Sequence, residues 1–220
     1  MTFTSLQADV RNYLERGSVN DPTVYEALPT LINFGERRIS RELKVLGFKI
    51  PAVFAMQASV AVYAKPDRWR QTASMNVGSS PVGTSIRNQM FARDYEYIRM
   101  YWPDDTATWS SVYGVPGVPL FYADYDYEHF IVAPTPDQSY PCELVYYQEP
   151  PLLDATNGEN WITKYAPRLL LYATMIEALL FVKKDDRVAT WQSLFDREAG
   201  MLNGEDTARI LDNNTTRQKD

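Results

Sequence analysis

The residues best placed for acid–base chemistry gather around the single histidine of the chain, His129. It stands in the segment Tyr125-Asp-Tyr-Glu-His-Phe-Ile-Val, close in sequence to the carboxylates of Asp124 and Asp126. A histidine beside carboxylates can act as a general base for a nucleophile, so any His-dependent hydrolysis or metal site would depend on this residue. The segment has the pattern of a strand, and a structural or surface histidine is the favoured interpretation.

Other chemical signatures are missing from the sequence. It contains no phosphate-binding glycine loop, no GxSxG elbow and no HExxH pair. The acidic pairs Asp104-Asp105 and Asp185-Asp186 could bind a hard cation or serve in catalysis, but adjacent acids in turns are mostly caps and solvated charge. Cys142 is the only cysteine, which excludes an internal disulfide and a cysteine-cluster zinc site. We therefore expect no catalytic residue, no metal site and no cofactor.

Aromatic residues, 13% of the chain, are concentrated between Tyr95 and Tyr127. Such side chains can stack on nucleobases, or they can form a β core and subunit interfaces. The chain is acidic and few basic residues lie between the aromatics, so we favour an interface over binding of single-stranded nucleic acid. The concentration comprises Tyr95, Tyr97, Tyr101, Trp102, Trp109, Tyr113, Phe121, Tyr122, Tyr125 and Tyr127.

The composition is that of a folded, acidic protein. The 220 residues are 45% hydrophobic, enough for one large domain or two small ones, and the formal charge is −6. With a pI of about 4.9, a wide basic surface for DNA phosphates is not expected. The first residues show no secretory pattern, and the longest apolar run, Leu169 to Val182, is too short to span a bilayer. We expect synthesis in the cytoplasm and no membrane association.

The elements that hold these residues begin with two helices. Thr4-Ser-Leu-Gln7 has the form of a capping box and opens a predicted amphipathic helix over residues 4–16. Pro29 is expected in the first turn of a second helix over residues 29–45, because proline is well tolerated only there. One face of the second helix is either solvated or a partner-binding patch; it carries Glu36, Arg37, Arg38, Arg41, Glu42 and Lys44.

The middle of the chain reads as short strands joined by turns. Strands are predicted over residues 53–63, 120–127, 129–133 and 142–148. Residues 94–101 fit either a helix or a strand. The region is expected to form an antiparallel sheet.

Helical periodicity returns after this region. Residues 168–182 are apolar on almost every side, which predicts a buried helix, and an amphipathic helix follows that should end near Asn203-Gly204. The predicted class is therefore α+β: a helical bundle from the N- and C-terminal helices with an inserted antiparallel β lobe. The predicted domains are 1–47 with 161–206 for the helical lobe, 48–160 for the β-rich lobe, and 207–220 for an extended C-terminal arm.

Several segments, taken in their order along the chain, carry a family resemblance. They are Phe3-Thr-Ser-Leu-Gln7, Phe34-Gly-Glu-Arg-Arg-Ile-Ser-Arg-Glu-Leu-Lys44, Ala133-Pro-Thr-Pro136, Leu144-Val-Tyr-Tyr147 before Pro150-Pro151-Leu152, and Asn160-Trp-Ile162. In this order the chain resembles the head-to-tail adaptor (connector) proteins of tailed bacteriophages, especially the short-tailed type. None of these segments is a catalytic motif.

The resemblance implies a structural protein and not an enzyme. Such adaptors form a ring, commonly of twelve copies, between the portal protein and the tail nozzle, at the head–tail junction of the virion. Genomic DNA passes through the lumen without specific binding, and a lumen of net negative charge would let it slide. The chain would be made in the host cytoplasm. In adaptors of this type the C-terminal helix and tail reach the portal, which makes the portal-binding candidates Arg209, Ile210, Leu211, Asn213 and Arg217.

Contact with the tail is expected at loops of the β lobe, through Trp102, Trp109 and Tyr113. Two other functions remain open from the sequence. One is a tail nozzle or tail-tube component that uses the β lobe for ring contacts; only an adaptor would bind both portal and tail proteins. The other is a small enzyme built around His129, Asp124 or Asp126, which would lose its turnover on His129→Ala.

Overall fold

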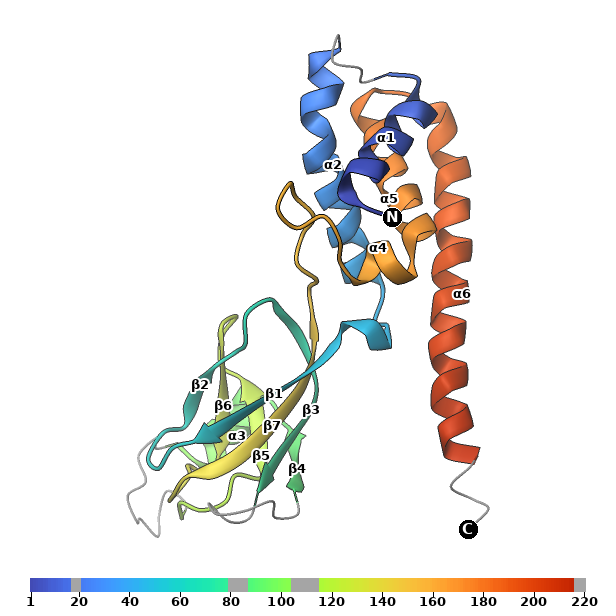
Figure 1. The fold of residues 1–220 in the computed structure, drawn as a ribbon. Coiled ribbons are helices and arrows are strands. Elements are labelled where there is room, and N and C mark those ends of the chain that lie inside the picture. Colours follow the sequence, from blue (N-terminus) through green and yellow to red (C-terminus); the bar gives the residue numbers. More distant parts are fainter. Residues whose placement is uncertain (17–20, 79–86, 104–114, 216–220) are drawn as a thin grey trace. The chain divides into compact units, whose positions relative to one another are not determined.

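The computed structural model describes residues 1–16, 21–78, 87–103 and 115–215. The chain forms two compact units (Figure 1). The helical unit comprises Met1–Phe48 and Glu149–Asp220, and the β unit comprises Lys49–Gln148. Helices build the first unit, and a seven-stranded sheet with one short helix builds the second, so the predicted α+β class is confirmed.

Helix α1 (Phe3–Leu14) has its N-cap at Thr2. The Oγ1 of Thr2 accepts a hydrogen bond from the backbone N–H of Ser5 at 3.2 Å, and the N–H of Thr2 donates to Ser5 Oγ at 2.9 Å. This pair satisfies free N–H groups of the first turn. The capping box predicted at Thr4-Ser-Leu-Gln7 is therefore wrong by two positions.

Helix α2 (Pro22–Glu42) begins at Pro22 and not at Pro29. Pro29 lies inside the helix, where a proline removes one backbone hydrogen bond and costs about 3 kcal/mol or more. The buried side chains of Val24, Leu28 and Ile32 form one continuous stripe across the proline. Burying each such side chain contributes roughly 1.5–3 kcal/mol, which offsets the cost of Pro29 and keeps the helix intact.

Glu36 is buried on α2, contrary to the solvated or partner-facing position predicted for it. Its side chain is 1% exposed, and Ile32 and Ile39 lie buried on the same face of the helix. One carboxylate oxygen accepts a hydrogen bond from the backbone N–H of Leu153 at 3.0 Å, and the other accepts from the side-chain amide of Asn160. Burial raises the pKa of Glu36 to about 7, although both hydrogen bonds lower it.

The rest of the helical unit consists of α4 (Trp161–Tyr165), α5 (Pro167–Phe181) and α6 (Val188–Thr215). Helix α5 packs against α1, α2, α4 and α6, as its nearly all-apolar surface requires. Short 3₁₀ turns lie at Leu46–Phe48 and Asp185–Arg187. Among the described residues, no helix combines the length and the apolarity that a membrane span would need.

Helix α6 continues to Thr215, so the end predicted near Asn203-Gly204 is wrong. A glycine inside an exposed helix costs only about 1 kcal/mol relative to alanine, which does not stop a long helix. Beyond Gly204, the carboxylate of Asp206 accepts a hydrogen bond from the backbone N–H of Leu46 at 2.7 Å. This contact holds the distal half of α6 to the segment after α2, and Figure 1 shows that half running past α4.

The sheet of the β unit has the strand order β1-β7-β3-β4-β5-β6-β2. All pairings between neighbours are antiparallel except β4 with β5, which is parallel, so the sheet is mixed and not wholly antiparallel as predicted. The strands are β1 (Lys49–Met56), β2 (Val62–Ala64), β3 (Trp69–Gly78), β4 (Arg87–Ala92), β5 (Phe121–Asp124), β6 (His129–Ala133) and β7 (Tyr140–Gln148).

The sheet curls, and its two edge strands approach one another. The ring of Phe54 on β1 lies 5.9 Å from that of Tyr63 on β2 and 6.1 Å from that of Phe130 on β6, measured between centroids. Cys142 is fully buried in the same core. Because residues 57–61 must turn to place β2 opposite β6, the single strand predicted over 53–63 is wrong.

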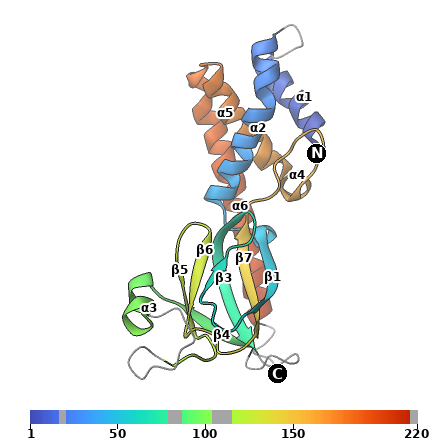
Figure 2. The same ribbon diagram turned by 90° about the vertical axis from the view of Figure 1, so that its left-hand side faces the viewer.

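Residues 94–101, which fitted either structure by sequence, are helical: α3 spans Tyr95–Tyr101. Figure 2 shows α3 beside β5 at one side of the sheet. A small core forms there around the buried side chain of Ile98, with Ala123 and Ile131 from the strands.

Candidate interaction surfaces

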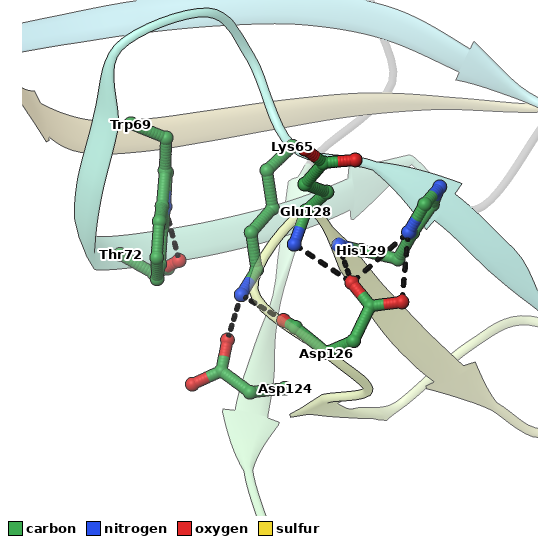
Figure 3. A network of polar contacts seen from close by, with 7 residues as sticks. All are labelled: Lys65, Trp69, Thr72, Asp124, Asp126, Glu128 and His129. Atoms are coloured by element: carbon green, nitrogen blue, oxygen red, sulfur yellow. Dashed lines mark hydrogen bonds and ion pairs between the residues drawn. The ribbon is translucent and has the colours of Figure 1, made fainter.

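His129 lies at the start of β6 and binds the carboxylate of Asp126 within a tight hairpin (Figure 3). Its Nδ1 is 3.0 Å from both carboxylate oxygens of Asp126. The Oδ1 of Asp126 also accepts hydrogen bonds from the backbone N–H groups of Glu128 at 2.7 Å and His129 at 2.6 Å. Partial desolvation opposes ionisation, but these hydrogen bonds hold the pKa of Asp126 below its ordinary value.

Asp124 does not join His129 and Asp126 in a common site. Its carboxylate lies 2.8 Å from Nζ of Lys65, which also donates a hydrogen bond to the backbone carbonyl of Asp126 at 2.8 Å. The Lys65 ammonium is 4.0 Å from the ring centroid of Trp69, and its side chain is only 4% exposed (Figure 3). The two carboxylates thus have separate partners, and the network fixes the hairpin instead of converging on a substrate position.

The described residues form no cluster of side chains that could bind a metal ion. No group of three or more His, Cys, Asp or Glu side chains is placed among them to hold an ion. Asp104 and Asp105 lie outside the described residues, as does the side chain of Asp185.

A cluster of aromatic and arginine side chains covers α3 and β5, and we call it the aromatic–arginine cluster. The ring of Tyr97 lies 4.8 Å from that of Tyr101 and 5.9 Å from that of Phe121, and Trp102 lies 5.6 Å from Phe121. Spacings of this size are those of attractive aromatic pairs. The cluster comprises Arg93, Tyr95, Tyr97, Arg99, Tyr101, Trp102, Phe121 and Tyr125.

Two guanidinium groups lie over these rings. Arg93 Cζ is 5.5 Å from the centroid of Tyr97, and Arg99 Cζ is 5.3 Å from that of Tyr95. Arg99 also donates a hydrogen bond from Nε to the hydroxyl of Tyr95 at 2.9 Å. At exposed sites each cation–π contact contributes roughly 0.5–1 kcal/mol, so these contacts favour the ring orientations seen here. A surface rich in tyrosine, tryptophan and arginine is typical of protein–protein interfaces.

The C-terminal helix offers a second exposed surface. Arg209 is exposed on α6, and its guanidinium lies 3.9 Å from the carboxylate of Asp206. The carboxylate of Asp206 also accepts a hydrogen bond from Leu46, so the exposed residues near Arg209 follow directly after a point where α6 is bound to the rest of the helical unit.

Comparison with known proteins decides the family. A family model described as SU10 adaptor protein matches residues 1–218. The chain belongs to the SU10 adaptor protein family. This membership confirms the resemblance to head-to-tail adaptors of short-tailed bacteriophages, and it implies a virion component that associates with portal and tail proteins. No curated protein matches the sequence.

Of the predicted tail-binding residues of this SU10 adaptor, only one lies among the described residues. Trp102 belongs to the aromatic–arginine cluster, whereas Trp109 and Tyr113 lie outside the described residues. Arg93 and Arg99 also belong to the cluster and were not among the residues predicted from the sequence. Their signal was present, because each lies four residues from a tyrosine that it covers in the structure.

Of the predicted portal-binding residues of the SU10 adaptor, those from Arg209 to Asn213 lie in the last turns of α6. The structure describes both the backbone and the side chain of Arg209. For Ile210, Leu211 and Asn213 it describes only the backbone, which is helical. Arg217 lies beyond the described residues. Contact of these positions with a portal protein stays a prediction.

Proposed function

We propose that this chain is the head-to-tail adaptor of its phage, forming a ring between the portal protein and the tail nozzle through which genomic DNA passes. The observation that supports the proposal most strongly is the match to the SU10 adaptor family over residues 1–218. The net charge of −6 supports free passage of DNA, because an acidic lumen does not retain phosphates. We propose twelve copies for the ring.

The tail contact of the proposal lies at the β unit. The aromatic–arginine cluster presents Tyr101 and Tyr125, with exposed fractions of 53% and 44%, on a framework held by arginines. Side chains that are ordered before binding lose little entropy in a complex. We place the tail nozzle or another tail protein at this cluster and, from the sequence alone, at Trp109 and Tyr113.

The portal contact of the proposal lies at residues 207–220, which we treat as the partner-binding arm. Arg209, Ile210, Leu211, Asn213 and Arg217 are the residues assigned to it. The hydrogen bond between Asp206 and Leu46 lies before the arm. Removal of residues 207–220 therefore leaves both partners of this hydrogen bond in the chain.

The proposal assigns no catalytic role to the chain. Asp126 binds His129, and Asp124 binds Lys65, which leaves neither carboxylate poised on a free reaction site. Replacement of His129 with alanine should therefore leave head–tail joining unchanged.

The test is to mix the purified chain separately with the portal protein and with the tail proteins of the same phage, and to measure complexes by size-exclusion chromatography. Binding to both is expected. A variant ending at Asp206 should lose the portal complex and keep the tail complex, and its circular dichroism should lose only the helical signal of residues 207–215. Binding to tail proteins alone would favour a nozzle or tail-tube component, and unchanged portal binding by the truncated chain would refute the arm.

A further inference from the structure

Two hollows on the helical unit are lined by side chains of opposite net charge. The first, the α2 hollow, has a volume of about 400 Å³ and is lined by Phe34, Arg37, Arg38, Arg41, Glu42 and Glu177. The second, the α6 groove, has a volume of about 200 Å³ and lies between the α4–α5 junction and α6. The residues of the groove that matter below are Tyr165, Arg168, Glu198, Met201 and Glu205.

The α2 hollow presents an exposed aromatic ring followed by cations. Phe34 is 46% exposed. Arg37 and Arg41 follow it by about one and two turns of the helix, so the three side chains share one face. Arg38 is engaged within the chain, at 3.0 Å from Glu177 and 3.1 Å from Glu42. The face offered to a partner therefore consists of Phe34, Arg37 and Arg41.

Arg41 has a charge that the described part of the chain does not neutralise. No carboxylate among the described residues lies within 4.0 Å of its guanidinium, whereas Arg37 has Glu149 at 3.8 Å. Both arginines are exposed enough to reach a second molecule. A partner surface that fits this hollow would offer an apolar pocket for Phe34 and carboxylates about one helical turn away from that pocket.

The α6 groove supplies both features. Met201 and Tyr165 are 57% and 70% exposed, and they form its apolar part. Glu198 and Glu205 lie three and four residues from Met201, that is about 4.5 and 6 Å along the helix. Phe34 is separated from Arg37 by a similar rise. Neither glutamate has an ion-pair partner in the described chain, and with Arg168 the groove carries a net charge of 1 − 2 = −1.

We propose that the α6 groove of one copy receives Phe34 of the next copy, with Arg37 pairing with Glu198 or Glu205, according to the direction of the neighbouring helix, and Arg41 adding positive charge at the same end. The two surfaces involve different residues, so each copy uses one with each neighbour. Such head-to-tail contacts generate a closed ring when the rotation between copies closes. The inference rests on the proposed adaptor ring and names the surfaces that hold it together.

The experiment uses phage particles whose only source of this protein is a variant with two introduced cysteines. The native Cys142 is fully buried and does not interfere. Arg37→Cys is combined with Glu198→Cys in one variant and with Glu205→Cys in another, because the direction of the neighbouring helix decides which pair meets. Under mild oxidation, one of the two should give a ladder of disulfide-linked multimers of this chain.

A matched control combines Glu26→Cys with Glu198→Cys. Glu26 is exposed on α2 more than two turns from the hollow, so this variant should give no ladder. A ladder from neither test pair in particles that contain the protein overturns the inference and leaves the adaptor function intact. Cross-links only to the portal or a tail protein overturn it as well, by giving the groove another occupant. Absence of the wild-type chain from particles would instead refute the adaptor function.

Charge reversal provides the second readout. Arg37→Glu with Arg41→Glu should reduce incorporation into particles about tenfold, equivalent to about 1.4 kcal/mol. Adding Glu198→Arg with Glu205→Arg should restore incorporation, which a fold damaged at α2 would not allow. Failure of this restoration in a chain with unchanged circular dichroism would contradict the proposed pairing.

Discussion

Replacing Glu36 with glutamine should change how the stability of the helical unit depends on pH. Burial raises the pKa of Glu36 from 4.5 to about 7 in the folded chain. Between these values the folded protein binds a proton that the unfolded chain releases. The contribution of Glu36 to stability is therefore fully present below pH 4.5 and is lost as the pH rises through about 7.

The size of this effect follows from the shift. A difference of 7 − 4.5 = 2.5 pKa units corresponds to about 3 kcal/mol, at 1.36 kcal/mol per unit. Glutamine cannot titrate, so the free energy of unfolding of wild type minus that of Glu36→Gln should fall by about 3 kcal/mol from pH 4.5 to pH 8. Glutamine also loses one acceptor for Leu153 or Asn160, which lowers its stability at every pH without changing the slope.

The assay is urea unfolding followed by far-UV circular dichroism, which reports the helices. Glu26→Gln is the matched control, since Glu26 is exposed on the same helix and should retain the pH slope of the wild type. Parallel stability curves for wild type and Glu36→Gln, or a difference that grows with pH, would refute the reasoning.

Three further substitutions probe packing and binding. Gly47→Ala places a methyl group on the ring of Trp161 and should lower the melting temperature strongly; combination with Trp161→Ala should recover part of the loss. Lys65→Met removes the partner of Asp124 and a cation–π contact, and we expect a loss of about 1 kcal/mol in urea unfolding, with no loss counting against a role for the network. Trp102→Ala should weaken binding to tail proteins at least tenfold in a pull-down titration while portal binding stays at the wild-type level, and an unchanged tail affinity would remove the cluster from the interface.

Elements with a strong local pattern could be predicted from the sequence. The strand predicted over residues 129–133 coincides with β6, and the apolar segment 168–182 coincides closely with α5. In both cases the period of the side chains and the flanking turn residues point to the same structure. The α+β class followed from such elements and their order along the chain.

Errors arose where a contact distant in sequence outweighed a local signal. Pro29 and Gly204 are helix-breaking residues by type, yet α2 buries an apolar stripe across the first and Asp206 anchors α6 beyond the second. Glu36 was placed on a charged, accessible face because its neighbours are charged, and only the positions of Leu153 and Asn160 explain its burial. A single sequence contains no information on such partners.

The candidate interaction surfaces could be predicted only in part from the sequence. The concentration of aromatics identified the region around Trp102, and the spacing of four residues between each arginine and the tyrosine it covers, Arg93 with Tyr97 and Arg99 with Tyr95, was the signal that could have added the two arginines. The α2 hollow and the α6 groove required the packed helices, because each combines residues from more than one element.

The most direct test of the adaptor function is an averaged image of the head–tail junction, viewed along the particle axis, for wild-type phage and for phage lacking this chain. The account predicts a ring of density below the portal and above the tail nozzle, with twelvefold symmetry, that is absent without the chain. An unchanged junction in particles lacking the chain, or density for the chain elsewhere in the particle, would contradict it.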